Sequence, residues 1–257
     1  MKLEDLFGLK GKVSIVTGGS AGIGLMMARG LAEAGSDVVI CSRKLEKCEE
    51  AAHEITQLGV RALPFRCDIT KLEEIDNMLE AVLKEFNKID VLVNNSGRTW
   101  GASPEEISVE DWKKVIDLNI NGTFFITQKV GRVMISQESG NIINIASYAA
   151  LKGSDPEVLN ALPYSTSKGA LIVFTKDLAT KWAKYNIRVN CIAPGWFPTK
   201  MTKWTLENLG EKITDRLLIK RFGVSEDIVG VTIFLASRAS AYMTGQVICV
   251  DGGLSVW

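Results

Sequence analysis

The chain has 257 residues, of which 46% are hydrophobic, and its formal net charge at pH 7 is zero. This length can bury a large core as one domain or two small ones, and the charges are spread out rather than gathered into the basic runs of nucleic-acid-binding or membrane-surface segments. No apolar run approaches the roughly 20 residues of a membrane span, and residues 1–5 lack the apolar core of a signal peptide, so we expect a cytoplasmic protein.

A glycine-rich stretch follows the first predicted strand. Residues 12–17 form a β-branched run, residues 18–24 contain four glycines, and a helical pattern occupies residues 25–34. A strand, a glycine turn and a helix N-terminus in that order let bare backbone N–H groups approach a pyrophosphate; the alternative is a loop with several positive-φ residues. The candidates for this contact are Gly18, Ser20, Ala21, Gly22, Ile23 and Gly24.

The second predicted strand, residues 37–41, ends in a basic tip. An acidic residue at such a tip bonds the ribose hydroxyls of NAD, whereas an arginine pairs with the 2′-phosphate of NADP. We therefore predict NADP(H) binding through Ser42 and Arg43, with a weaker contribution from Lys44. Asp37 opens the strand and is expected to point away from the cofactor. The alternative is a solvated, charged start to the next helix, residues 45–58.

Two more predicted strands end in residues suited to a nucleotide crevice. The strand at residues 61–67 leads to Asp68 and Ile69, and the strand at residues 89–93 leads to Asn94-Asn95-Ser96-Gly97. Small and amide residues at parallel-strand ends can bond neighbouring strands and line such a crevice. Between these strands, the apolar spacing of residues 72–86 predicts a helix. A long helical segment follows and contains Asn119 and Asn121, although asparagine is locally unfavourable within a helix.

A hydroxyl, a phenol and an ammonium group come from the next strand and helix. The strand at residues 141–145 delivers Ser147, and Tyr164 and Lys168 are four residues apart on a helix over residues 164–185. Positions i and i+4 share a face, so the ammonium is expected to lower the phenol pKa from about 10 and allow proton transfer near neutral pH. Alone, this spacing also fits an amphipathic helix with a surface lysine, and Ser147 fits an ordinary strand-end turn.

The alternation of strands and helices continues to the C-terminus. A strand at residues 187–193 is closed by residues 194–199, residues 200–222 are irregularly helical, and a helix at residues 225–235 precedes a last strand at residues 246–250. This order predicts one doubly wound α/β domain, residues 1–257, with about seven parallel strands and helices on both faces. The segment at about 200–222 fits either a lid over an apolar or amphipathic substrate or a surface helix pair.

Cysteine and histidine are too sparse to predict a metal site. His53 is the only histidine, and the cysteines contain no Cys-x-x-Cys pair. A structural zinc site needs four ligands, so we expect reduced and mostly buried thiols instead. The cysteines are Cys41, Cys48, Cys67, Cys191 and Cys249.

In this order, the motifs resemble those of the short-chain dehydrogenase/reductase family, classical type, from about residue 9 to residue 253. They are Thr17-Gly18-x-x-x-Gly22-x-Gly24, Asn94-Asn95-Ser96-Gly97, Asn119-x-x-Gly122, Ser147, Tyr164-x-x-x-Lys168 and Pro194-Gly195-x-Phe197-x-Thr199. The resemblance implies a Rossmann-type fold with a cofactor half at about 9–150 and a substrate and catalytic half at about 140–257. It also implies an enzyme that transfers a hydride reversibly between NADP(H) and a carbonyl or secondary alcohol.

The resemblance assigns roles to individual residues. Ser147 would polarise the carbonyl, Tyr164 would donate the proton, Lys168 would lower the Tyr164 pKa, and Asn119 would bend its helix, hold a water and relay protons, with Asn121 as the alternative. Cofactor contacts are implied for the adenine, for the nicotinamide ribose and for the nicotinamide carboxamide. They come from Asp68 and Ile69, from Tyr164 and Lys168, and from Pro194, Gly195, Phe197 and Thr199 respectively, with Asn95, Ser96 and Gly97 lining the crevice.

The sequence departs from the family pattern at three places. Ser96 replaces an alanine, Phe197 replaces an aliphatic residue, and 17 positions separate Ser147 from Tyr164, about four more than expected. The excess, residues 153–160, predicts a longer loop over the substrate pocket.

The substrate is predicted from the branch of the family. Residues 3–7 and 193–202 resemble gluconate 5-dehydrogenases and β-ketoacyl reductases, and Trp100, the apolar lid and the NADP signature favour a 3-oxoacyl or bulky ketone substrate. A keto-sugar acid is the alternative, favoured by two or more cationic pocket residues, and a steroid or xenobiotic ketone is a third. A silent dinucleotide-binding sensor or scaffold is disfavoured because all four catalytic positions are filled. A homo-oligomer, tetramer or dimer, is implied by the family.

Overall fold

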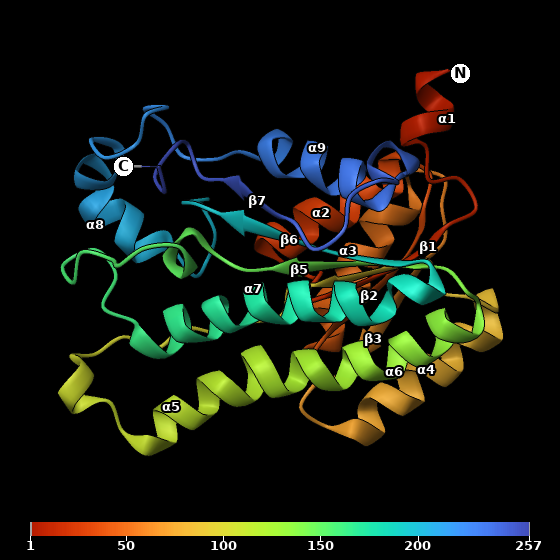
Figure 1. Ribbon diagram of the computed structural model, residues 1–257, viewed down its shortest axis with the longest axis horizontal. Helices are drawn as coiled ribbons and strands as arrows, with labels where there is room; N and C mark the ends of the chain where they lie inside the picture. Colours follow the sequence, from red (N-terminus) through yellow and green to blue (C-terminus); the bar gives the residue numbers. More distant parts are fainter. Residues whose placement is uncertain (1, 257) are drawn as a thin grey trace.

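A computed structural model describes residues 2–256, in which seven parallel strands form one sheet in the order β3-β2-β1-β4-β5-β6-β7 (Figure 1). The strands alternate with helices along the chain, which confirms the predicted doubly wound α/β fold. The strands are β1 (Val13–Thr17), β2 (Asp37–Ser42), β3 (Ala62–Arg66), β4 (Val91–Asn94), β5 (Gly140–Ile145), β6 (Ile187–Pro194) and β7 (Val247–Val250).

Helices cover both faces of the sheet. In Figure 1, α2 and α9 lie above the strands, and α4, α5, α6 and α7 lie below them. The helices are α1 (Leu3–Phe7), α2 (Gly22–Glu33), α3 (Leu45–Thr56), α4 (Leu72–Phe86), α5 (Val109–Ile116), α6 (Thr123–Ser136), α7 (Leu162–Trp182), α8 (Lys203–Thr214) and α9 (Ser225–Ala236). No described helix is both long and apolar enough to cross a membrane.

The central strands are apolar on both sides because each side packs against a helical layer. Val16, Ile40 and Ile143 point into a core formed with α2, α3 and α9. Their chain neighbours point the other way, into a core formed with α4, α6 and α7. Side chains alternate along a strand, so continuous apolar runs such as β1 serve both cores.

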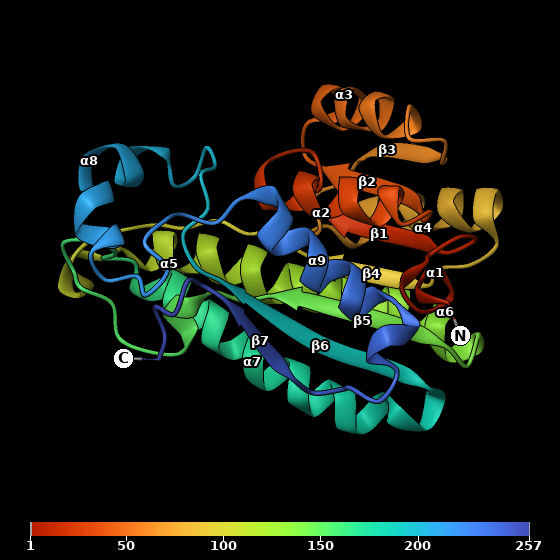
Figure 2. The ribbon, with the colours of Figure 1, turned by 90° about the horizontal axis from the view of Figure 1, so that it is seen from above.

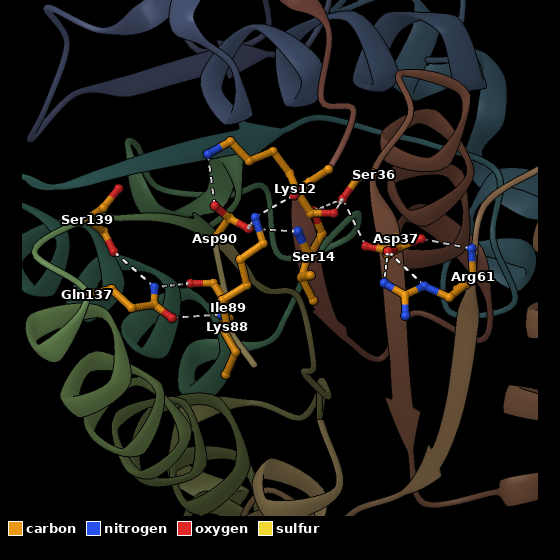
Figure 3. A network of polar contacts seen from close by, with 12 residues as sticks. Lys12, Ser14, Ser36, Asp37, Arg61, Lys88, Ile89, Asp90, Gln137 and Ser139 are labelled. Atoms are coloured by element: carbon orange, nitrogen blue, oxygen red, sulfur yellow. Dashed lines mark hydrogen bonds and ion pairs between the residues drawn. The ribbon is translucent and has the colours of Figure 1, made fainter. Parts of the chain in front are cut away.

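A polar network joins the strands at the end of the sheet where β1 and β2 begin (Figure 3). Asp90 accepts the Val13 N–H at 2.9 Å and the Lys12 ammonium at 2.9 Å. Asp37 binds the Arg61 guanidinium, with 2.6 Å between Oδ2 and Nη2. Asp37 therefore lies at the amino end of β2, which confirms that it points away from the opposite, carboxyl end.

The carboxyl ends of β1 and β4 form the switch point of the sheet. The connection from β1 leads outward to β2, whereas the connection from β4 leads to β5 on the other side. Loops therefore diverge here and leave a crevice, which is where doubly wound proteins bind ligands.

One helical prediction needs correction, and the predicted long middle helix contains a π-helical turn. The irregular segment at 200–222 contains only α8, with a non-helical backbone at Leu209 (φ −128°), and residues beyond Asp215 form one turn and then irregular, bent backbone. The long middle helix is interrupted by the π-helical turn Asp117–Gly122 between α5 and α6.

Candidate active site and cofactor cleft

The glycine turn after β1 leaves room for a ligand at the N-terminus of α2. Gly18 and Gly22 have positive φ angles of 64° and 54°. A Cβ at Gly24 would lie 2.3 Å from the Gly18 carbonyl oxygen, so the turn closes only with glycine there. The N-cap, Ala21, offers no side-chain acceptor, and the first N–H groups of α2 are therefore available to a pyrophosphate.

A cavity of about 360 Å³ extends from this turn across the carboxyl ends of the strands. It brings together every residue expected to bind cofactor except Ser20 and Lys44, and every expected catalytic residue except Asn119. These lining residues are Gly18, Ala21, Gly22, Ile23, Gly24, Ser42, Arg43, Asp68, Ile69, Asn95, Ser96, Gly97, Ser147, Tyr164, Lys168, Pro194, Gly195, Phe197 and Thr199.

The β2 end of the cavity carries hydroxyls and a cation. Ser20 lies just outside and donates to the Ser42 Oγ at 3.0 Å. Arg43 is exposed, whereas Asp68 lies half-buried across the cleft. Burial raises the Asp68 pKa, but hydrogen bonds from Thr70 and the charge of Arg43 outweigh it and hold the pKa below its usual range. This end therefore combines a charged carboxylate with an exposed guanidinium, and no acidic residue lies at the tip of β2.

Asn95 ties the glycine turn to the end of β4. Its Nδ2 donates to the Thr17 carbonyl at 2.9 Å, and the Thr17 hydroxyl accepts the N–H groups of Asn95 and Ser96. A Cβ at Gly18 would lie 2.9 Å from this Nδ2. The turn and the β4 loop are therefore held in close contact under the cleft.

Lys168 is held in a buried position beside Tyr164. Only 4% of Lys168 is exposed, and its Nζ donates to the Ile145 carbonyl at 2.7 Å and lies 5.6 Å from the centre of the Tyr164 ring. Burial lowers the pKa of Lys168 to about 8, against a smaller opposing effect of Cys191. Burial in the cavity thus disfavours the charged form of Lys168.

The expected lowering of the Tyr164 pKa is wrong for this structure. Burial raises the pKa of the phenol, and the opposing influence is a hydrogen bond with Ser147 rather than the charge of Lys168. The reason is geometric, since the ammonium is bonded to the Ile145 carbonyl instead of the phenol oxygen. Tyr164 is therefore a protonated phenol whose oxygen is hydrogen-bonded with Ser147, and this bond lowers its pKa by less than burial raises it.

Asn119 supports the catalytic helix from the π-helical turn. It is fully buried, and its Nδ2 donates to Ser167 Oγ at 2.8 Å and to the Arg98 carbonyl at 3.0 Å. Its Oδ1 accepts the Arg98 N–H at 2.9 Å. Asn121 instead bonds Asp117 at the surface, so the structure brings Asn119 and not Asn121 to the site.

The loop after β6 closes the cavity beside the glycine turn. A Cβ at Gly195 would lie 2.6 Å from the Asp251 Cα, and the Phe197 ring is buried in the core. Thr199 packs over the glycine turn, because a Cβ at Gly22 would lie 3.3 Å from its Cγ2. Phe197 therefore fills the place of an aliphatic residue as a core side chain.

Sequence reasoning missed part of the lining. Thr202 donates to the Phe197 carbonyl at 2.6 Å and accepts the Thr199 N–H at 2.9 Å. The two threonines, three residues apart before a helix, are a turn signal that could have predicted this contact. The missed residues are Cys67, Leu118, Ile145, Ala146, Lys200, Met201 and Thr202.

Comparisons with known proteins agree along the whole chain. Residues 12–210 match the short chain dehydrogenase family. The chain is 37% identical over 260 residues to a gluconate 5-dehydrogenase of Gluconobacter oxydans, covering 100% of this chain and 99% of the relative. It is 39% identical over 247 residues to the 3-oxoacyl-(acyl-carrier-protein) reductase FabG of Aquifex aeolicus, covering 96% and 98%.

A solved structure of similar architecture contains a bound nucleotide. The gluconate 5-dehydrogenase of Burkholderia cenocepacia, in complex with NADP and tartrate, has a TM-score of 0.94 and 33% identity, covering 100% of both chains.

Proposed function

Because this chain belongs to the short-chain dehydrogenase family, we propose that it is an oxidoreductase that transfers a hydride reversibly between NADP(H) and a carbonyl or secondary alcohol. The observation that carries this proposal is one cavity that joins the glycine turn to Ser147, Tyr164 and Lys168. A nucleotide held at the turn would extend toward the three catalytic side chains.

The residues of the cleft fit the cofactor. The glycine turn leaves backbone N–H groups open for the pyrophosphate, Ser42 and Arg43 would hold the 2′-phosphate, and Lys168 with Tyr164 would hold the nicotinamide ribose. The bound nicotinamide supplies or accepts the hydride, because no side chain can do so.

The catalytic groups divide the remaining chemistry. Ser147 would bond the carbonyl oxygen and polarise it, and Tyr164 would pass its proton to that oxygen as negative charge develops. Burial keeps the phenol protonated, which suits carbonyl reduction. Asn119 would act through Ser167 and the Arg98 backbone by fixing the start of α7, and we retain the proposal that it takes part in a proton relay.

The preference for NADP rests on the end of β2. Arg43 and Ser42 face the cavity, whereas Asp37 lies at the opposite end of the strand, bound to Arg61. A solved gluconate 5-dehydrogenase of the same fold is described in complex with NADP.

The first substrate candidate is a 3-oxoacyl or bulky ketone substrate. Met201 lines the cavity and is 52% exposed, and Trp204 on α8 is 68% exposed. Apolar side chains at a cavity mouth favour an apolar substrate body, and a 3-oxoacyl reductase is among the relatives.

The second candidate is a keto-sugar acid, as in the gluconate 5-dehydrogenase relative. Lys152 and Arg216 line a cavity of about 90 Å³ together with Tyr148, the neighbour of Ser147. Lys152 and Arg216 would be the cations close to a substrate carboxylate, and Arg216 also pairs with Asp155 of the same cavity at 2.8 Å.

We also propose how the domain is divided, where the protein is located and how it assembles. One domain would divide into a cofactor half at about 9–150 and a substrate half at about 140–257, with α8 as the lid. The location is proposed to be cytoplasmic, as expected from the sequence. A homo-oligomer is proposed because β7 is an edge strand of the described sheet, and an edge strand offers backbone groups to a second copy. Light scattering of the purified protein tests the assembly.

The test is oxidation of NADPH and, separately, NADH against β-ketoacyl thioesters, 5-ketogluconate and bulky ketones. Turnover with NADPH should fall by roughly 10²-fold or more in Tyr164→Phe, because proton transfer is lost while the ring remains. Turnover of a thioester or of 5-ketogluconate selects the substrate class. Cofactor binding without turnover of any carbonyl would instead support a silent binding protein.

A further inference from the structure

Two segments outside the sheet meet beside the catalytic side chains. One is residues 148–161, between Ser147 and α7, and the other is α8 with residues 215–223. Figures 1 and 2 both place α8 and the loop after η3 (Tyr148–Ala150) at the same end of the molecule, where the strands end. The additional residues that separate Ser147 from Tyr164 therefore pack against the predicted lid.

An apolar cluster joins these segments to the catalytic tyrosine. We call it the distal cluster, and it contains Tyr148, Ala149, Val158, Leu159, Tyr164, Trp196, Leu206, Leu209, Ile213, Leu217, Phe222 and Leu254. The centroids of the Tyr148 and Trp196 rings within it lie 5.8 Å apart. Tyr164 belongs to the same cluster as α8, so a displacement of α8 would change the surroundings of the catalytic phenol.

One carboxylate joins the two segments electrostatically. Asp155 Oδ2 lies 3.1 Å from Lys212 Nζ and 2.8 Å from Arg216 Nη2. The two cations are four residues apart, at the end of α8 and just beyond it, and converge on a side chain that is only 17% exposed. Hydrogen bonding by the Glu157 N–H, followed by Lys212, holds the pKa of Asp155 below its usual range. The carboxylate is therefore charged at neutral pH.

Asp155 also organises its own loop. Its Oδ1 accepts the Glu157 N–H at 2.9 Å, and its carbonyl accepts the N–H groups of Val158 and Leu159. These bonds direct Val158 and Leu159 into the distal cluster. The same residue thus shapes the loop and binds the helix that lies against it.

We propose that Asp155 is a positioning residue that latches α8 onto residues 148–161 and thereby sets the affinity for substrate. The inference rests on the proposed dehydrogenase function. A closed latch keeps both walls of the substrate side in contact and excludes water from Ser147 and Tyr164. Breaking it lets α8 separate from the loop, while the glycine turn and the β2 end, which bind the cofactor, are unchanged.

The first test is Asp155→Asn, which keeps the shape and removes the charge. Loss of a partly exposed ion-pair network should raise the substrate KM about fivefold and lower kcat by a smaller factor, with the KM for NADPH unchanged. The matched control is Glu157→Gln, because Glu157 also pairs with Lys212 but is 76% exposed. The control should keep the substrate KM of the wild type, and an equal rise in both variants would overturn the latch.

A double-mutant cycle separates the latch from the role of Asp155 in its own loop. If Asp155 acts through α8, then Lys212→Met should also raise KM, and the double variant Asp155→Asn/Lys212→Met should be no worse than Asp155→Asn alone. If the KM increases of the two single variants multiply in the double variant, Asp155 acts only within its loop and the proposal is refuted. Raised ionic strength should increase KM in the wild type but not in Asp155→Asn.

Hydrogen exchange tests the latch without turnover. Amides of residues 203–217 should exchange at least several-fold faster in Asp155→Asn than in the wild type, with β1 and β4 unchanged. If no carbonyl is turned over but this exchange rises, the proposed function fails and the latch stands. Unchanged exchange together with an unchanged KM would overturn the latch alone.

Discussion

Lys168 combines two demands that oppose each other in a folded protein. It must lie within reach of Tyr164, inside a cavity, yet burial disfavours its charge and lowers its pKa to about 8. Its one described hydrogen bond, to the Ile145 carbonyl, offsets only part of that cost. The position is therefore strained electrostatically, as functional sites commonly are.

This strain predicts a pH-dependent stability. The folded pKa lies below the ordinary value of 10.5, so the unfolded chain binds more protons between pH 8 and 10.5, and this residue's contribution to stability rises across that window. Below pH 8 the full cost is present, on the order of 3 kcal/mol. Lys168→Met should therefore be more stable than the wild type at pH 7, and the difference should shrink toward pH 10.5.

Urea unfolding at several pH values measures this difference. The control is Lys176→Met on the exposed face of the same helix, which should change stability by less than about 0.5 kcal/mol. A destabilised Lys168→Met at pH 7 would contradict the argument.

Arg43 should control the choice of cofactor. Removing a charge-assisted contact to a phosphate costs about 1.5–3 kcal/mol, so Arg43→Ala should raise the KM for NADPH roughly 10- to 100-fold. The KM for NADH should change little because NADH lacks the 2′-phosphate. Steady-state kinetics with both cofactors measures this, and Lys44→Ala, which alters a side chain outside the cavity lining, is the control. An equal rise in KM for both cofactors would mean that Arg43 does not bind the 2′-phosphate.

At the scale of elements, helices with regular apolar spacing could be predicted from the sequence, whereas segments that depend on tertiary contacts could not. The helix Leu72–Phe86 was predicted with its boundaries, because its apolar spacing is regular and its ends carry clear signals. Residues 200–222 were overpredicted as helix because the bent backbone after Asp215 depends on contacts with Gly252. The π-helical turn at Asn119 was expected only as a bend, and the close approach of Gly122 at its end to Ile69 is a contact between segments far apart in the sequence.

The candidate site could likewise be predicted from local sequence patterns but not where it depends on tertiary contacts. Strand ends and the glycine turn could be predicted, since parallel strands bring their carboxyl ends to one edge. The hydrogen bond from Lys168 to Ile145 could not, and the pKa direction of Tyr164 was therefore mistaken.

The glycine turn between β1 and α2 gives a prediction about stability and cofactor affinity. Gly24→Ala would place a Cβ against the backbone oxygen of Gly18, which cannot move aside like a flexible side chain. We expect a loss of about 1–3 kcal/mol in stability and a weakened affinity for NADPH, measured by unfolding and by fluorescence titration. Gly230→Ala on α9, where an added Cβ meets nothing within 4 Å, should be neutral or stabilising by up to about 1 kcal/mol. Wild-type affinity in Gly24→Ala would show that the turn can relax.

Across the whole molecule, the two ends of the sheet carry different tasks. The carboxyl ends of the strands hold the cavity, and the amino ends hold the polar network of Asp90, Asp37 and their partners (Figure 3). Tyr164 and Lys168 on α7 and Ser147 after β5 thus lie at the opposite end of the sheet from the polar network. Stability and activity should respond separately to changes at the two ends.

Asp90 tests this separation. Its carboxylate accepts the Val13 N–H and pairs with Lys12 and Lys88, and it is only 13% exposed. Asp90→Asn removes the charge and forces an amide into a site built of donors, so we expect a loss of about 1–3 kcal/mol in unfolding free energy. Under native conditions kcat and KM should stay within about twofold of the wild type, because the β1 and β4 strands remain paired over their carboxyl ends. A large fall in kcat in a fully folded variant would mean that strain at the amino edge reaches the cavity, and the two ends would then not be independent.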